Sequence, residues 1–352
     1  MSFMNMKIPV IQGGMGIGVS LGGLAGAVAK EGGAGTISAA QIGYREANFI
    51  KNPLEANLRA LEKELKKAKN IAQGRGAIGV NIMAATRHYD AYVKKAVEAG
   101  ADFIVSGAGL PMKLPSLTKG SKVKLIPIVS SKKAAAVICR RWWKKDGKIP
   151  DAIVIEGPKA GGHLGFSKEQ IRAYNIEEKQ NTTDKYEEEI KEIIDFVRQF
   201  GQEQGQYIPV FTAGGYRTKA DLLHQMELGA DGIQAASIFV TTEECDADPN
   251  FKQAYIASKK EDICIVDSPV GMPGRAICNS FVKRAKEENI PPKHCYGCLL
   301  QCNPTQTPYC ISEALIQAVR GNTEEGLIFC GANSWKEDKI RTVKEVMETF
   351  WL

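Results

Sequence analysis

Residues 151–163 read Asp-Ala-Ile-Val-Ile-Glu-Gly-Pro-Lys-Ala-Gly-Gly-His. The run Asp151–Ile155 has the length and the isoleucine and valine content of a strand that is buried on both faces. Glycines and a histidine follow it, at a point where an apolar run would otherwise continue. This stretch therefore predicts a buried parallel strand whose carboxyl end carries functional residues.

The same pattern recurs along the first 245 residues, where strand-like runs alternate with stretches that have helical apolar spacing. Eight such units predict an α/β protein, specifically a TIM (β/α)8 barrel over residues 1–245, with a doubly wound open sheet as the alternative. Residues 246–352 are expected to form a helical and irregular extension that packs on the barrel. The eight expected strands are Pro9–Gln12, Ala34–Ser38, Ala77–Ile82, Asp102–Ser106, Lys124–Val129, Asp151–Ile155, Ile208–Ala213 and Gly232–Ala236.

Composition limits the possible functions of the chain. The net charge of +6 is small for 352 residues, and lysines alternate with glutamates, as in residues 61–67, so solvated helix faces are favoured over a nucleic-acid site. No apolar run is long enough to cross a membrane, and no signal peptide is expected before Pro9–Gln12. The nine cysteines are an odd number, which favours a reducing, cytoplasmic setting.

The carboxyl ends of the strands in such barrels form the active site. Here these ends are rich in glycine, which allows the backbone N–H groups to approach a flat ring or a phosphate closely. Gly214-Gly215 precedes an expected helix, and Ala236-Ser237 follows the eighth strand. Together these two segments predict a phosphate site at a helix N-terminus.

Four motifs in this order resemble the nitronate monooxygenase (2-nitropropane dioxygenase) family, which also includes FMN-dependent enoyl-acyl-carrier-protein reductases. The resemblance covers residues 7–245 well and 246–290 more loosely. It implies an FMN-dependent oxidoreductase with the flavin in the mouth of the barrel. The motifs are Ile11-Gln12-Gly13-Gly14-Met15, Gly79-Val80-Asn81-Ile82-Met83, Ala160-Gly161-Gly162-His163-Leu164-Gly165 and Ala213-Gly214-Gly215.

The resemblance also implies which residues contact the cofactor. The flavin ring would lie beside the Gln12–Met15 segment and Asn81, and the phosphate would lie beside Gly214, Gly215, Ala236 and Ser237. The sequence departs from the family at Ala236-Ser237-Ile238, where members often have Gly-Thr-Arg. The complete implied set is Gln12, Gly13, Gly14, Met15, Asn81, Gly161, Gly162, Gly214, Gly215, Ala236 and Ser237.

His163 is the candidate catalytic residue. A single histidine is often structural, but this one follows two glycines at a strand end within a flavin-site motif. Histidine titrates near neutral pH, so it can remove or donate a proton or bind an anion beside the flavin.

A cluster of cysteines lies in the expected extension, within residues 295–310. Four thiols in a proline-rich stretch could bind zinc or an iron–sulfur cluster, and reduced structural cysteines are the alternative. The candidate metal ligands are Cys295, Cys298, Cys302 and Cys310.

Three functions remain open at this stage. The first is oxidation of alkyl nitronates with O2, and the second is reduction of an enoyl thioester with NAD(P)H as the electron donor. The third is a non-catalytic flavin- or metal-binding protein. The expected partner is a small-molecule substrate, with neither nucleic acid nor membrane, and a homodimer is one of the assemblies left open.

Overall fold

The computed structural model describes residues 3–174 and 185–351. Eight parallel strands close into a barrel, in which the first strand pairs with the last through Val10↔Ile233. This closure confirms the predicted TIM barrel and excludes the open sheet, and each strand lies within two residues of its expected bounds. In barrel order the strands are β1 (Val10–Gln12), β2 (Ala34–Ser38), β3 (Ala77–Asn81), β4 (Phe103–Ser106), β5 (Lys124–Val129), β6 (Ile153–Glu156), β8 (Val210–Ala213) and β9 (Gly232–Ala235).

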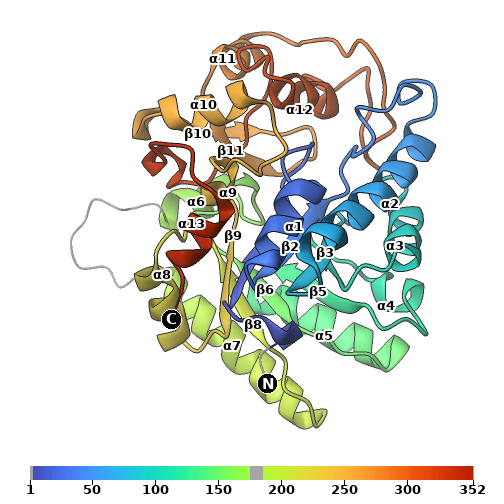
Figure 1. The fold of residues 1–352 in the computed structure, drawn as a ribbon, viewed down its shortest axis with the longest axis vertical. Helices are drawn as coiled ribbons and strands as arrows, with labels where there is room; N and C mark the ends of the chain where they lie inside the picture. Colours follow the sequence, from blue (N-terminus) through green and yellow to red (C-terminus); the bar gives the residue numbers. More distant parts are fainter. Residues whose placement is uncertain (1–2, 175–184, 352) are drawn as a thin grey trace.

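Helices cover the outside of the barrel (Figure 1), and local sequence sets their ends. Helix α2 begins where Asn52 accepts a hydrogen bond from the Glu55 N–H and proline occupies the first position. Thr218 and Asp221 form a capping box at the start of α8. These outer helices are α1 (Gly22–Lys30), α2 (Pro53–Ala72), α3 (Tyr89–Glu98), α4 (Leu114–Leu117), α5 (Lys132–Asp146), α7 (Lys185–Glu203) and α8 (Lys219–Glu227).

The interior of the barrel is a packed core. Phe103, Phe211 and Val154 belong to one buried cluster inside it. Phe3, in the short 3-10 helix η1 (Phe3–Asn5), places its ring 5.7 Å from that of Phe211. Because aromatic and branched side chains fill the centre, a ligand can enter only at the carboxyl ends of the strands.

The chain after β9 first leaves the barrel and then returns to it. Helix α9 (Ser237–Val240) is only four residues long, and the following segments lie across one end of the barrel (Figure 1). Helix α13 (Val343–Glu348) then packs with Leu24 of α1 and Leu222 of α8. The segments in between are α10 (Pro249–Ala257), η2 (Lys260–Asp262), β10 (Ile263–Asp267), β11 (Pro273–Ile277), α11 (Ser280–Glu287), α12 (Ile311–Val319) and η3 (Ser334–Lys336).

A second, three-stranded sheet connects this extension to the barrel. Its order is β10-β11-β7, in which β7 is the pair Gly162–His163 that follows β6 and precedes α6 (Lys168–Tyr174). Strand β11 pairs antiparallel with β7 through Gly274↔His163 and Arg275↔Gly162. The extension therefore holds the histidine that the sequence singled out.

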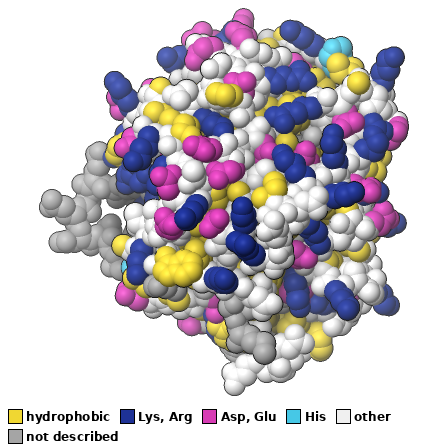
Figure 2. Space-filling view, viewed as in Figure 1, with side chains coloured by type: hydrophobic (Ala, Val, Ile, Leu, Met, Phe, Trp, Pro, Cys, Tyr) yellow, Lys and Arg dark blue, Asp and Glu magenta, His cyan; other side chains and the backbone are white. Residues whose placement is uncertain are grey.

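The surface carries mixed charge. Figure 2 shows basic and acidic side chains interspersed over the face in view, as the alternation of lysine and glutamate predicts. Within residues 3–174 and 185–351, no helix is long and apolar enough to span a membrane.

We expect Gly35→Ala to destabilise the barrel strongly. A Cβ at Gly35 would lie 1.9 Å from the carbonyl oxygen of Ala25, so α1 would have to move away from β2. The free energy of unfolding should fall by more than about 3 kcal/mol in chemical denaturation.

Gly74→Ala is the matched control. An alanine at its positive φ of 72° would be strained, but no atom lies within 4 Å of the added Cβ. This variant should lose only about 1–2 kcal/mol. Equal losses for the two variants would contradict the packing argument.

Candidate active site

A cavity of about 580 Å³ opens where the strands end beneath the extension. Its walls contain all but one of the predicted cofactor and catalytic residues: Gly13, Gly14, Met15, Asn81, Gly161, Gly162, His163, Gly214, Gly215, Ala236 and Ser237. The exception is Gln12, which is fully buried below the cavity. There its Oε1 accepts from the Thr36 N–H at 2.9 Å and its Nε2 donates to the Gly13 carbonyl.

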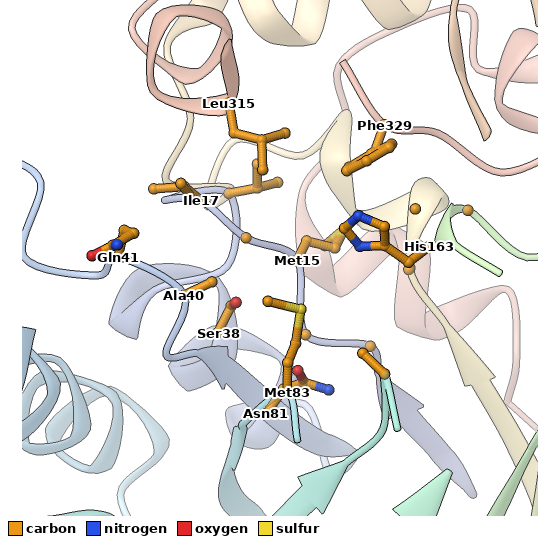
Figure 3. A pocket seen from close by; sticks show the side chains of 18 of the residues that line it. Met15, Ile17, Ser38, Ala40, Gln41, Asn81, Met83, His163, Leu315 and Phe329 are labelled. Atoms are coloured by element: carbon orange, nitrogen blue, oxygen red, sulfur yellow. The ribbon is translucent and has the colours of Figure 1, made fainter. Parts of the chain in front are cut away.

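Glycine is required where two strand ends approach one another. A Cβ at Gly14 would lie 2.4 Å from the Cβ of Asn81. This contact is too short for any other residue, so the Gly13-Gly14 turn can pass directly over Asn81. The two motifs therefore form one surface on the cavity floor (Figure 3).

The corner between β8 and β9 combines glycines with polar groups from the extension. Gly214 and Gly215 have φ values of 137° and 81°, which strongly favour glycine. The Asn333 side chain donates to the Gly215 carbonyl at 2.8 Å, and Ser237 Oγ accepts from the Gly331 N–H at 2.9 Å. Sequence reasoning missed Gly331 and Asn333, because they lie about a hundred residues from the motifs they complete.

The cavity walls fit a flavin nucleotide. Gln234 Oε1 is a buried wall atom for which no hydrogen-bond partner is found in the described part of the chain. Unsatisfied buried polar atoms are costly, and a polar ligand in the cavity would satisfy them. Arg217 also lines the cavity, where its guanidinium contacts Glu337 at 2.7 Å. Arg217 thus places a guanidinium in the cavity wall, whereas residues 236–238 lack the arginine that family members often have there.

Arg275 of β11 fixes the segment that leads to His163. Its side chain is only 3% exposed, and its Nη1 donates to the carbonyl of Pro158 at 2.8 Å and to the carbonyl of Ala160. A buried guanidinium needs such acceptors. The Pro158–Ala160 turn is therefore held by the same strand that pairs with Gly162–His163.

The imidazole of His163 lies in a largely apolar environment (Figure 3). Its Nε2 is 2.7 Å from Ser268 Oγ, and the ring of Phe329 lies edge-on with centroids 4.9 Å apart. Burial lowers the pKa of His163 to about 4, so the ring is neutral near pH 7.

Ser268 holds one nitrogen of this neutral ring. Its Oγ accepts from the Val270 N–H at 3.3 Å and keeps both a proton and a second lone pair for His163 Nε2. When Ser268 donates, the ring proton sits on Nδ1, and when Ser268 accepts, Nδ1 presents its lone pair. No hydrogen-bond partner of Nδ1 is found among the residues that the structure describes. Ser268 belongs to the extension, and no motif in the sequence points to it.

Glu156 is a second titratable group in the cavity wall that the sequence did not single out. Its Oε2 accepts from the Gly165 N–H at 2.9 Å and from Ser130 Oγ at 3.2 Å. Burial raises the pKa of Glu156 to about 7. Its carboxyl group thus closes the loop that carries His163 and titrates near neutral pH.

The four candidate metal ligands lie in the extension as free cysteines that differ in their surroundings. Cys298 and Cys302 pack against one apolar cluster and Cys310 against another, while Cys295 is exposed. Burial raises the pKa of the Cys310 thiol to about 11. Among residues 3–174 and 185–351, no group of three or more His, Cys, Asp or Glu is placed to hold a metal ion, and the zinc or iron–sulfur site stays a prediction.

A closed barrel with a glycine-lined cavity at its strand ends, and a histidine facing that cavity, fits a flavin-dependent oxidoreductase of the TIM-barrel class. The chain belongs to the nitronate monooxygenase family, which it matches over residues 1–351. This match confirms the resemblance drawn from the four motifs and extends it through the C-terminal extension.

Individual relatives agree with this assignment. A probable nitronate monooxygenase of Staphylococcus haemolyticus is 27% identical over 316 residues, which cover 82% of this chain and 81% of that protein. A probable nitronate monooxygenase of Staphylococcus aureus strain Newman is 30% identical over 208 residues, covering 58% of this chain and 51% of that protein.

Two solved structures share the fold. FabK from Thermotoga maritima superposes with a TM-score of 0.72 at 24% identity, covering 99% of this chain and 93% of that one. A nitroalkane oxidase from Streptomyces ansochromogenes also has a TM-score of 0.72, at 17% identity, covering 98% and 95% of the two chains.

We expect Ser268→Ala to lower turnover about tenfold, because one hydrogen bond that orients His163 is lost. Ser116→Ala, which removes an exposed hydroxyl bonded to Asp146, is the control and should leave turnover unchanged. Steady-state kinetics measure both variants, and wild-type turnover in Ser268→Ala would refute the orienting role.

Glu156→Gln should change how stability depends on pH. The unfolded carboxyl releases its proton near its ordinary pKa of 4.5, whereas the folded carboxyl keeps it to about 7. The native state therefore binds the extra proton between these values, and wild-type stability falls as the pH rises through this window. The glutamine variant lacks this loss.

Melting temperatures of the two proteins, recorded from about pH 5 to about pH 8, check this expectation. The variant should gain stability relative to the wild type as the pH rises. A constant difference across the range would show that Glu156 does not titrate there.

Proposed function

We propose that this protein oxidises alkyl nitronates in the cavity at the strand ends, with FMN bound there and O2 as the final oxidant. Membership of the nitronate monooxygenase family supports the reaction class. The observation that carries the proposal is the neutral His163, which faces the cavity between Met15 and Phe329 (Figure 3).

The cavity walls divide the binding of FMN between two regions. Gly13, Gly14 and Asn81 would hold the ring, and Gln234 would gain the partner it lacks. Gly214, Gly215 and Ser237 would hold the phosphate, with Arg217 nearby. When bound, FMN supplies the electron-transfer chemistry that no side chain can provide.

His163 would act on the nitro group or on its anion. When Ser268 donates to Nε2, the Nδ1–H group is available and can donate a hydrogen bond to a nitronate oxygen. An anion bound there would raise the pKa of His163, because a nearby negative charge favours imidazolium. In the other tautomer Nε2–H donates to Ser268, and the free Nδ1 lone pair could take up the α-proton of a neutral nitroalkane.

Apolar side chains around His163 suit an alkyl substrate. Met15, Met83 and Phe329 surround the space in front of the ring (Figure 3). They exclude water from the reacting atoms, which strengthens the interaction between the anion and Nδ1–H. A small polar substrate would leave these surfaces unfilled.

The first test is the reduction of the bound flavin under anaerobic conditions. We expect a primary alkyl nitronate to bleach the flavin absorbance and O2 to restore it. Rapid bleaching by NAD(P)H and turnover of an enoyl thioester, without nitronate turnover, would favour the reductase instead. A protein that binds no flavin would refute the whole proposal.

His163→Ala should lower kcat/KM for the nitronate by about a hundredfold or more, because the polar group at the reacting atoms is lost. His224→Ala is the matched control, since this exposed histidine on α8 pairs with Glu187 at 2.7 Å, away from the cavity. Equal activity of the two variants would remove His163 from the mechanism.

A further inference from the structure

The cavity extends beyond His163 into a second arm, which is enclosed by three segments. These are the start of α2, the start of α3 and the loop of residues 295–299 from the extension, all of which line the cavity. The Gln41 side chain donates to the Tyr296 carbonyl at 3.4 Å, and the Arg87 N–H donates to the Cys298 carbonyl at 3.0 Å. The loop is therefore attached on both sides of the arm.

The polar walls of the arm are already satisfied. Asn57 Nδ2 donates to Gln41 Oε1 at 2.7 Å, and Asn57 Oδ1 accepts from the Gly43 N–H at 2.7 Å. Arg87 Nε also donates to the Leu299 carbonyl at 3.4 Å. These bonds fix the shape of the arm and leave the charged ends of side chains as its main means of recognising a ligand.

Positive charge predominates along the lining. Glu156 is the only acidic residue among the described residues that line the cavity, whereas Lys51, Arg87 and Arg217 are basic. Arg217 is already paired with Glu337 near the glycine corner. Lys51 and Arg87 are exposed, and neither has a carboxylate partner in the part of the chain that the structure describes.

Apolar side chains line the path between these cations and His163. Ile17 and Leu315 lie across the cavity from His163, on the side of Gln41 (Figure 3). Met83 and Leu299 line the same cavity.

We propose that Lys51 and Arg87 recognise an anionic group at the end of the substrate that is remote from the reacting carbon. The substrate class is then an elongated molecule with an apolar chain and a terminal carboxylate or phosphate. This inference rests on the proposed function for the reacting end, which His163 receives. Both cations are exposed, so each contributes modestly, about fivefold in affinity.

The test compares nitronates of equal chain length that end in a methyl group, a carboxylate or a phosphate monoester. We expect KM to be about tenfold lower for a charged end than for the methyl end, with similar kcat. The carboxylate and phosphate substrates distinguish the two sources of the anion. Equal KM values for all three would overturn the inference and leave the proposed function intact.

Substitutions of the two cations then test whether they cause the preference for a charged end. Lys51→Ala and Arg87→Ala should each reduce the preference for a charged end about fivefold, with unchanged kcat for the methyl-ended substrate. Lys133→Ala, an exposed lysine at the start of α5 outside the cavity lining, is the matched control. A preference that persists in the Lys51 and Arg87 double variant would overturn the assignment.

A binding measurement separates failure of the inference from failure of the proposed function. Calorimetry of the flavin-loaded protein with saturated diacids and monoacids of equal length requires no turnover. The diacid should bind about fivefold more tightly to the wild type and equally to the double variant. Loss of nitronate turnover with this pattern intact would refute only the reaction, and equal binding of both acids to the wild type would refute the anion site.

Discussion

The pairing of the two-residue strand β7 with β11 is the constraint on which the site depends. It joins the loop after the sixth barrel strand to a hairpin more than a hundred residues further along the chain. Arg275, from the same hairpin, binds the carbonyls that precede His163, and Ser268 binds its ring. Without the hairpin, the motif that carries His163 would be an unsupported loop.

The barrel and much of the cavity could be predicted from local sequence. Strands such as Ile153–Glu156 are continuous apolar runs because they are buried on both faces, and glycines at their ends show where a ligand approaches. Ser268, Asn333 and Arg275 could not be found in this way. They are ordinary polar residues in sequence, and only long-range packing brings them to the site.

The protonation states of the groups in the cavity follow from the small number of charges buried there. His163 is kept neutral and Glu156 titrates near neutral pH because both lose solvation, and the fixed polar contacts are mostly with backbone groups. A cavity with so little fixed charge beside the reacting atoms can accept an anion and a flat ring without strong repulsion. The lining cations without a carboxylate partner in the described chain, Lys51 and Arg87, are instead exposed.

The return of α13 to the barrel has a consequence for biosynthesis. Helix α13 packs beside α1 and α8, yet about a hundred residues separate it from β9. At ordinary rates of translation, that stretch takes about 5–20 s to emerge. During this interval the apolar faces of Leu24 and Leu222 lack their final cover. The uncovered surface of α1 and α8 would then be a binding site for chaperones. Mutations that slow the translation or docking of residues 241–342 would lower the yield of folded protein without changing the cavity.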